Sequence, residues 1–545
     1  MKIALAQRNY IIGDFEGNIS KIKEDIIKAR HKGADLVVFA ELAVSGYPPR
    51  DFLEFEDFVN RCYDATEEIA KETKGIAAII GLPTLNPHEK GKSLRNSAAF
   101  LHDGRIEAFT HKALLPNYDV FDEYRYFEPD YDFQTIDYRG KRLAVTVCED
   151  IWNVEGDYQY VVSPLDELKA SQPDLIINIS ASPFHYDQPA IRKRILRANV
   201  RKYELPIVYL NHVGAQTELL FDGNSQVMNQ NGDTLLELEY FVEDFGVVDL
   251  DQAQSINPKP LPEKMEAIEQ ALVMGLKNYF SKLGLQRALL GLSGGIDSAV
   301  TAVIATKALG PENVYGVLMP SEFSSDHSVK DALELAQNLG IQHDTIKVNQ
   351  VVKSFEDTLS PYFNNRSFDV TEENIQARAR GVILMGLSNK FGHILLNTSN
   401  KSEAAVGYGT LYGDMNGGLS VLGDVYKTEV FALARHINKA YEVIPENIIT
   451  KPPSAELRPD QKDSDSLPDY NTLDAILLMY IEKRMGPKAI IGKGYDAHLV
   501  DRVLKMVNTT EYKRHQTPPI LRISPKAFGM GRRMPIVAKY LVAGK

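Results

Sequence analysis

Apolar and polar residues follow two different patterns through the first half of the chain. Apolar runs at 2–7, 35–41 and 76–83 have the length of buried strands, whereas apolar residues at 18–32 and 57–72 recur every three to four positions, as on one face of a helix. Strands and helices that follow each other in this way are typical of layered α/β domains. We therefore predict a layered α/β domain in the first half.

Two dipeptides in this half mark tight turns. Asp103-Gly104 and Asn231-Gly232 each separate two strand-like segments. Asp-Gly and Asn-Gly are favoured in two-residue hairpin turns, because both central residues must adopt positive φ angles. Each dipeptide predicts a β-hairpin, so the sheets of this half are not purely parallel.

A proline-rich stretch, SINPKPLPEK, interrupts the pattern near the middle of the chain. It contains three prolines and no apolar periodicity, which is typical of a linker. We predict two domains, 1–250 and 263–545, joined by a linker at 251–262. Strand-like and helical segments alternate again after the linker, so the second domain is predicted to be a doubly wound parallel sheet.

Two stretches of the second half lack any such pattern. Residues 405–424 are rich in glycine, and residues 456–470 are polar and contain prolines. Long segments without regular structure in a compact domain are usually lids or disordered loops. We therefore expect both stretches to be mobile.

Composition and charge narrow the range of partners. The 545 residues are 44% hydrophobic and 25% charged, as in ordinary globular proteins, and no apolar stretch approaches the roughly 18 residues that span a bilayer. The net charge of −12 opposes non-specific binding to nucleic acids or anionic membranes. Cys62 and Cys148 are far apart in the sequence, which fits a reducing compartment. We expect a cytoplasmic protein with small-molecule substrates, no nucleic acid and no membrane.

The segment GLSGGIDSAV, 291–300, lies between a strand-like run and a helical one. A strand that enters a helix through glycines forms a nest of backbone N–H groups at the positive end of the helix dipole, which suits a phosphate. Asp297 would repel a phosphate unless a cation lies between them, and Mg²⁺ is the expected cation. Glu403, beyond a strand that ends at Thr398, lies at the same predicted sheet edge. It is expected to share the metal, the alternative being an ordinary surface acid.

The motif SGGIDS resembles the pyrophosphate-binding loop of the N-type ATP pyrophosphatases, which split ATP into AMP and pyrophosphate. The resemblance implies that ATP is bound by Gly291, Leu292, Ser293, Gly294, Gly295, Ile296, Asp297 and Ser298. Six further segments occur in the order found in NAD synthetases: TEENIQARAR, NTSNKSE, GYGTLYGD, DVYKTEV, PSAEL and EYKRHQ. They extend the resemblance over most of 263–545.

The same resemblance assigns substrate contacts. By this likeness, ATP is contacted by Thr398 and Ser454, and deamido-NAD⁺ by Asn374, Glu403 and Lys513. Lys427 is a weaker candidate for the phosphates, because a lysine at a helix start is usually solvated.

An enzyme that forms an amide at the expense of ATP needs ammonia, since the ammonium ion is not a nucleophile. Cys148 follows the strand-like segment 142–147, at the carboxyl edge of the sheet, where the active sites of α/β proteins tend to lie. Glu149 and Asp150 come next, and their negative charges should raise the pKa of the thiol, so a cation must compensate. Lys112 is the candidate cation, and Glu41 is the candidate general base.

Glu41, Lys112 and Cys148 stand in sequence contexts that resemble the Glu-Lys-Cys triad of the nitrilase superfamily. The resemblance covers about 1–250 and implies a four-layer α-β-β-α sandwich that hydrolyses glutamine. It also implies that Tyr118 and Ser182 bind glutamine.

Four residues of this half carry weaker assignments. Gln188 stands where related glutaminase domains commonly have a glutamine-binding lysine, and an ungapped alignment keeps Arg192 nearby. Glu123 is either a second carboxylate that supports the triad or an ordinary surface acid. Cys62 lies in a helical pattern, so a packing role is expected.

Together the two domains resemble glutamine-dependent NAD synthetases along nearly the whole chain. The resemblance implies that Cys148 releases ammonia from glutamine, that ATP adenylates deamido-NAD⁺, and that ammonia displaces AMP to give NAD⁺. It also implies a homo-oligomer, often an octamer in bacterial members. Two alternatives stay open: another glutamine-dependent amidotransferase of the N-type ATP pyrophosphatase class, and a catalytically inactive nucleotide-binding regulator.

Overall fold

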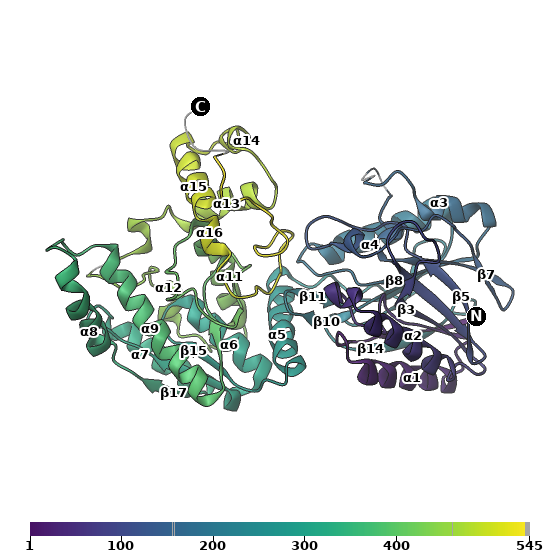
Figure 1. The fold of residues 1–545 in the computed structure, drawn as a ribbon, viewed down its shortest axis with the longest axis horizontal. Helices are drawn as coiled ribbons and strands as arrows, with labels where there is room; N and C mark the ends of the chain where they lie inside the picture. The colour runs from purple at the N-terminus through teal and green to yellow at the C-terminus, as the bar shows by residue number, and fades with distance from the viewer. Residues whose placement is uncertain (155, 157–158, 460, 540–545) are drawn as a thin grey trace. The chain divides into compact units, whose positions relative to one another are not determined.

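The computed structural model describes residues 1–154, 156, 159–459 and 461–539 (Figure 1). The chain forms two compact units, Met1–Pro262 and Glu263–Lys545. Among the helices that are described, none combines the length and apolar character needed to cross a membrane.

Unit 1 contains two six-stranded sheets. The first has the order β14-β1-β2-β3-β4-β5, and the second has the order β13-β12-β9-β8-β7-β6. The strands of the first sheet are Asp244–Asp249, Lys2–Gln7, Leu36–Val38, Ala77–Leu85, Leu94–His102 and Arg105–His111. Those of the second are Thr234–Glu237, Gln226–Met228, Ile207–Asn211, Leu175–Ser180, Lys141–Val147 and Ile136–Tyr138. A separate pair, β10 (Val213–Gln216) and β11 (Leu219–Asp222), completes the strands described in this unit.

Helices cover the outer faces of these two sheets. The helices α1 (Phe15–His31) and α2 (Glu56–Ala70) share a core with the first sheet, and α3 (Pro164–Leu168) and α4 (Gln188–Tyr203) share a core with the second. The unit is thus a four-layer α-β-β-α sandwich, as predicted. Cys62 of α2 is buried in the first of these cores, which confirms its packing role.

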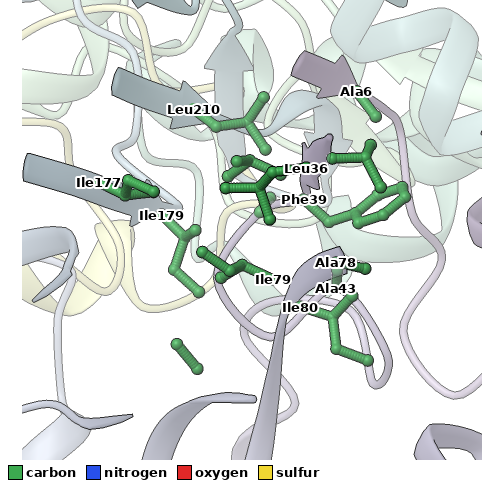
Figure 2. Packing of buried hydrophobic residues seen from close by; sticks show 14 of the residues in the cluster. Ala6, Leu36, Phe39, Ala43, Ala78, Ile79, Ile80, Ile177, Ile179 and Leu210 are labelled. Carbon is green, nitrogen blue, oxygen red and sulfur yellow. The ribbon is translucent and has the colours of Figure 1, made fainter. Parts of the chain in front are cut away.

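Figure 2 shows the apolar layer between the two sheets, where Leu36 and Ile79 of the first sheet lie near Ile177 and Leu210 of the second. Successive residues of β8 point to opposite faces, so Ile177 enters this layer while Ile176 packs in the core with α4. A strand covered on both faces needs apolar residues at nearly every position. This requirement explains why inner strands such as β2 and β9 are nearly continuous apolar runs.

Both predicted hairpins are confirmed. Strands β4 and β5 pair antiparallel around Asp103 and Gly104, which have φ angles of +47° and +86°. Strands β12 and β13 pair antiparallel on either side of Gly232, whose φ is +84°. Because β7, β8 and β9 pair in parallel, the second sheet is mixed.

Unit 2 is built on a five-stranded sheet of order β17-β16-β15-β18-β19, in which every pairing is parallel, as predicted. The strands β15 to β19 are Ala288–Gly291, Val314–Leu318, Gln342–Thr345, Ile394–Asn397 and Leu419–Ser420. The helices α5 to α9 are Lys264–Lys282, Ile296–Leu309, Asp326–Leu339, Asn349–Leu359 and Val370–Phe391. The strand order reverses between β15 and β18, and doubly wound sheets bind ligands at the carboxyl edge beside such a reversal.

In the carboxyl-terminal half of unit 2, the regular elements described are helices apart from β19, and long loops connect them (Figure 1). The helices α10 to α16 are Lys401–Val406, Lys427–Ile437, Glu446–Thr450, Tyr470–Ile481, Pro487–Ile491, Ala497–Thr509 and Glu511–Arg514. Residues of α10, α13 and α15 share one apolar core, which includes Ala405, Leu477 and Val503. The packing of α10 in this core joins the helical region to the segment that follows β18.

The expectation of a mobile segment at 405–424 is wrong. Leu419, Val421 and Leu422 are fully buried, and Leu419 belongs to β19. A Cβ at Gly413 would lie 3.0 Å from the backbone of Ala377, so the glycines of this segment allow close packing. In the second segment, 456–470, Gln461, Asp463 and Leu467 are buried, while position 460 lies outside the described residues.

Candidate active sites

Cys148 lies at a sharp turn at the end of β7, where the 3-10 helix Cys148–Ile151 begins. Its φ of +44° is unusual for a residue with a side chain. The Asp150 carboxylate fixes the turn, because it accepts hydrogen bonds from the backbone N–H groups of Val147 (2.9 Å), Ala113 (3.1 Å) and Leu114 (2.9 Å). This arrangement ties the cysteine turn to the chain that directly follows Lys112.

Lys112 lies between two carboxylates in the interior of unit 1. Its Nζ is 2.7 Å from Glu41 Oε1 and 2.9 Å from Glu123 Oε1. Lys112 and Glu41 are fully buried, and Glu123 is 5% exposed. Burial alone would lower the pKa of Lys112, but Glu123 and Glu41 outweigh it and raise that pKa well above its ordinary value. The two carboxylates therefore favour the protonated, positively charged form of the lysine.

Further donors hold the two carboxylates. Glu41 accepts from Asn96 Nδ2 at 2.7 Å and from the backbone N–H of Ala181 at 2.8 Å. Glu123 accepts from the Tyr47 hydroxyl at 2.9 Å, and Asn96 Nδ2 is also 3.3 Å from Glu123 Oε2. Burial raises the pKa of Glu123 to about 7. Glu123 is therefore part of the buried cluster, which corrects the alternative of a surface acid.

The thiol of Cys148 is itself buried, and burial is the largest cause that raises its pKa well above the ordinary value. Glu41 raises it further and Lys112 lowers it, while Glu149 contributes less than either. Glu149 and Asp150, to which the sequence led us to assign the rise, therefore have a smaller part in it than burial. Lys112 is the neighbour that lowers this pKa, which is the direction the sequence led us to expect.

The predicted glutamine-binding residues form two pairs of contacts, of which the Tyr118 contact involves the cysteine turn. The Tyr118 hydroxyl donates to Glu149 Oε1 at 2.7 Å, and Gln188 Nε2 donates to Ser182 Oγ at 3.2 Å. Arg192 instead forms a buried ion pair with Asp222, at 2.6 Å. Gln188 and Ser182 therefore lie together, whereas the charge of Arg192 is already neutralised within the core.

In unit 2, the SGGIDS loop joins β15 to α6 as predicted. Gly294 has a φ of +77°, and a Cβ there would lie 2.2 Å from the carbonyl oxygen of Ser328. Only glycine fits such a position. The hydroxyls of Ser293 and Ser298 are 3.1 Å apart, and Ser293 Oγ accepts from the backbone N–H of Gly295 at 3.1 Å. The loop is thus held in shape by its own hydrogen bonds.

A second lysine lies between two carboxylates beside this loop. Lys427 Nζ is 2.5 Å from Asp297 Oδ2 and 3.2 Å from Glu403 Oε1. Asn400 Nδ2 donates to Asp297 Oδ1 at 2.9 Å. Lys427 is 2% exposed, so it is not the solvated surface lysine of the alternative interpretation. The Glu403 side chain is 17% exposed and is paired with Lys427, so it is not an ordinary surface acid, and burial raises its pKa to about 7.

These groups line a cavity of about 830 Å³. Seven of the eight loop residues border it, all except Gly294, together with Thr398, Glu403, Lys427 and Ser454. Ser454 Oγ donates to the carbonyl oxygen of Gln461 at 2.5 Å. The cavity combines backbone and hydroxyl donors with basic side chains, Lys427 among them, and five carboxylates, which include Asp297 and Glu403. It therefore suits a ligand that carries phosphates together with a cation.

The family comparisons divide the chain in the same way as the two units. Residues 2–257 match the carbon-nitrogen hydrolase family, and residues 268–517 match the NAD synthase family. The chain is 43% identical to the glutamine-dependent NAD(+) synthetase of Synechocystis sp. over 99% of both chains. It is 44% identical to the enzyme of that name from Acinetobacter baylyi, over 98% of both chains. The chain belongs to the glutamine-dependent NAD⁺ synthetase family.

A solved structure of this family gives the same picture. The glutamine-dependent NAD⁺ synthetase of Acinetobacter baumannii, solved in complex with ADP, is 41% identical and has a TM-score of 0.79, with 98% of each chain covered. The two units of the present chain thus follow the fold of a two-domain NAD⁺ synthetase.

Two residues that the NAD synthetase resemblance assigns to deamido-NAD⁺ lie outside the lining of the cavity. Asn374 Oδ1 accepts from Thr410 Oγ1 at 2.7 Å, and Lys513 Nζ donates to the carbonyl oxygens of Gly407 and Gly409, both at 2.7 Å. Both residues therefore hold the 407–414 segment, of which Tyr408, Gly413 and Asp414 border the cavity.

The oxygen donors of Asp297 and Glu403 fit Mg²⁺, which commonly uses one or two carboxylates together with phosphate oxygens and water. Within the described part of the chain, no group of three or more His, Cys, Asp or Glu side chains is arranged to hold a metal. A metal held by Asp297 and Glu403 would take its remaining ligands from phosphate oxygens and water.

Sequence reasoning missed several residues that these centres use. Asn96 and Tyr47 support the carboxylates of unit 1, and Asn400 supports Asp297 in unit 2. Asp463 borders the cavity and accepts from the hydroxyls of Tyr408 (3.3 Å) and Tyr470 (2.9 Å). Only Asn400 had a signal in the sequence, because it lies inside the motif NTSNKSE.

Proposed function

We propose that the chain makes NAD⁺ from deamido-NAD⁺, with ATP as co-substrate and glutamine as the source of ammonia. The products are NAD⁺, AMP, pyrophosphate and glutamate. One observation carries this proposal: each unit contains a buried lysine between two carboxylates, beside a cysteine turn in unit 1 and beside a phosphate-type loop in unit 2.

In unit 1, Cys148 Sγ attacks the carboxamide carbon of glutamine. Glu41 accepts the thiol proton and passes it to the departing nitrogen, so ammonia leaves and a glutamyl thioester remains. Water then cleaves the thioester to glutamate and restores the thiol. The fixed charge of Lys112 stabilises the negative charge that develops during attack, and Tyr118, Ser182 and Gln188 bind the substrate. The anchoring of Glu41 by Lys112, Asn96 and the Ala181 N–H supports its role as base.

In unit 2, a carboxylate oxygen of deamido-NAD⁺ attacks the α-phosphorus of ATP and pyrophosphate leaves. Ammonia then attacks the carbonyl carbon of the adenylate, and AMP leaves as NAD⁺ forms. ATP is bound by the SGGIDS loop with Thr398, Ser454 and Lys427, and deamido-NAD⁺ by Asn374, Glu403 and Lys513. Asp297 and Glu403 would hold Mg²⁺, which supplies positive charge to the phosphates when bound.

Two further properties belong to this proposal. We infer a homo-oligomer, often an octamer in bacterial members of the family, and a cytoplasmic location. Both cysteines, Cys62 and Cys148, are free thiols, which supports a reducing compartment. Light scattering on the purified chain measures the assembly directly.

The function is tested by offering the purified chain ATP, Mg²⁺ and glutamine with one of three acceptors: deamido-NAD⁺, xanthylate or aspartate. We expect AMP and pyrophosphate only with deamido-NAD⁺, together with NAD⁺. Turnover with xanthylate or aspartate would identify a different amidotransferase. Nucleotide binding without pyrophosphate release from any acceptor would identify a regulator.

A further inference from the structure

The first turn of α11, which carries Lys427, is held by residues from elsewhere in the chain. Helix N-termini have N–H groups without partners inside the helix, and a Ser, Thr, Asp or Asn at the N-cap usually accepts from one of them. The N-cap of α11 is Tyr426, whose side chain provides no such hydrogen bond. The first N–H groups of α11 therefore require acceptors from outside the helix.

Ser402 and Asp474 provide these acceptors. Ser402 Oγ accepts from the backbone N–H of Lys427 at 2.8 Å. Asp474 Oδ2 accepts from the backbone N–H of Thr428 at 2.9 Å and from the Thr428 hydroxyl at 2.8 Å. An anionic acceptor at this end of a helix is also favoured by the helix dipole. Asp474 thus caps α11 from a different helix, α13.

The same carboxylate also binds the segment that carries Glu403. Ser402 Oγ donates to Asp474 Oδ1 at 2.5 Å, so one hydroxyl links Asp474 to the Lys427 backbone. Ser402 directly precedes Glu403, and Thr428 directly follows Lys427. Asp474 is 6% exposed and Ser402 is fully buried. A single buried carboxylate therefore holds the two neighbours of the lysine and carboxylate that face the cavity.

Asp297 is connected to this arrangement through Asn400. Asn400 Oδ1 accepts from the backbone N–H of Glu403 at 3.0 Å, and Asn400 Nδ2 donates to Asp297 at 2.9 Å. The helix α10, which begins one residue after Asn400, has only six residues. A helix of this length is marginal by itself, so its direction depends on such tertiary contacts.

We propose that Asp474 is a positioning residue for the synthetase reaction: it sets Lys427 and Glu403 relative to Asp297 before ATP binds. The inference rests on the function proposed above. Asp474 does not border the cavity, so it acts through Ser402 and Thr428 and not through the substrate. Functional groups must be held within about 0.5 Å of their productive geometry, and long side chains such as lysine depend on a fixed backbone for this.

Asp474→Asn is the first test, because it keeps the shape of the side chain and replaces one acceptor oxygen by an NH₂ group that cannot accept. We expect NAD⁺ formation from ammonium to fall in kcat by about 10- to 100-fold, the size expected for small misplacements of reacting groups. Glutamine hydrolysis measured without ATP and deamido-NAD⁺ should be unchanged. The matched control is Asp501→Asn at an exposed position of α15, which should keep both activities.

A second pair of variants applies where Asp474→Asn folds poorly. Thr428→Val removes only the hydroxyl donor and should lower the ammonium-driven kcat by about threefold to tenfold, as expected for one hydrogen bond. Thr428→Ser keeps both donors and should restore the wild-type rate. Equal loss in the serine and valine variants would overturn the inference.

A double variant separates positioning from a general loss of stability. If Asp474 acts partly through Lys427, then Asp474→Asn should cause a smaller fold loss of rate in a Lys427→Met background than in the wild-type chain, the remainder being due to Glu403. Fold losses that multiply in the double variant would overturn the inference, as would wild-type ammonium-driven rates in Asp474→Asn. A wild-type chain that makes no NAD⁺ from ammonium would instead overturn the proposed function, and the inference with it.

Discussion

Each unit contains a buried lysine between two carboxylates, but the exposure of these carboxylates differs between the two units. In unit 1, the Lys112, Glu41 and Glu123 side chains are 0%, 0% and 6% exposed. In unit 2, the Lys427 side chain is 3% exposed, but those of Asp297 and Glu403 are 18% and 17% exposed. The lysine is buried in both centres, whereas the carboxylates face open space only in unit 2.

This difference matches the two kinds of chemistry. In unit 1, Asn96, Tyr47 and a backbone N–H fix the carboxylates, so their oxygens stay in place while Glu41 takes up and releases a proton in the proposed reaction. In unit 2, the carboxylates border a cavity of about 830 Å³, where an incoming metal and phosphates can reach them. The closed centre of unit 1 (Lys112, Glu41 and Glu123) therefore suits proton transfer. The open centre of unit 2 (Lys427, Asp297 and Glu403) suits the binding of a charged ligand.

The largest expected effect concerns the open centre. Asp297→Asn should lower NAD⁺ formation from both glutamine and ammonium by about 100- to 1000-fold, the usual cost of removing one preorganised electrostatic contact. Glutamine hydrolysis in the absence of ATP should persist, because it takes place in unit 1. NAD⁺ production and glutamate release are measured on the same sample. Near-normal NAD⁺ formation at ordinary Mg²⁺ concentration would contradict a role for Asp297 in holding the metal.

The next effect concerns the residues that hydrogen-bond to the carboxylates of the closed centre. Asn96→Ala removes the donor shared by Glu41 and Glu123 and should lower glutamine-driven NAD⁺ formation by about 10- to 100-fold. Formation from ammonium should stay at the wild-type rate, which serves as the internal control. A parallel loss of both activities would mean that Asn96 supports the fold as a whole and not the glutaminase centre.

The smallest effect concerns the pKa of the Cys148 thiol. The direction of the change in pKa depends on whether a positive or a negative neighbour is removed. Lys112→Met should raise the pKa of Cys148 and slow its alkylation between pH 7 and 9. Glu123→Gln should lower that pKa and speed alkylation, since Lys112 lowers and Glu123 raises the pKa of the thiol. A shift of about one pH unit corresponds to about a tenfold change in rate.

Mass spectrometry of the Cys148 peptide follows this reaction without interference from Cys62, for which burial raises the pKa to about 12. Shifts of the same sign in the two variants would contradict the charge argument.

The local sequence was sufficient to locate the candidate functional residues that directly follow a strand. Cys148 directly follows β7, and the SGGIDS loop follows β15, so apolar runs located both centres. The α/β architecture, both hairpins and the parallel sheet followed from periodicity and turn residues. The burial of Lys427 was not predictable, because a lysine at a helix start is usually solvated.

The rest of the site depends on contacts between distant segments. Asp474 binds Ser402, which is 72 residues away in the sequence, and Asn96 binds Glu41, which is 55 residues away. The periodicity of apolar and polar residues carries no information about such pairs of distant residues. The glycines at 405–424 were misread as a sign of mobility, because composition alone does not distinguish a flexible loop from one whose glycines permit close packing.

The central claim is that each lysine centre serves one half of the reaction, and Cys148→Ala tests it most directly. NAD⁺ is measured with glutamine and, separately, with ammonium chloride at about pH 8.5, where more of the ammonia is free base. Cys62→Ala is the matched control and should keep both activities. We predict no NAD⁺ from glutamine and near wild-type NAD⁺ from ammonium in Cys148→Ala. Glutamine-driven synthesis by this variant, or loss of both activities in a folded sample, would contradict the account.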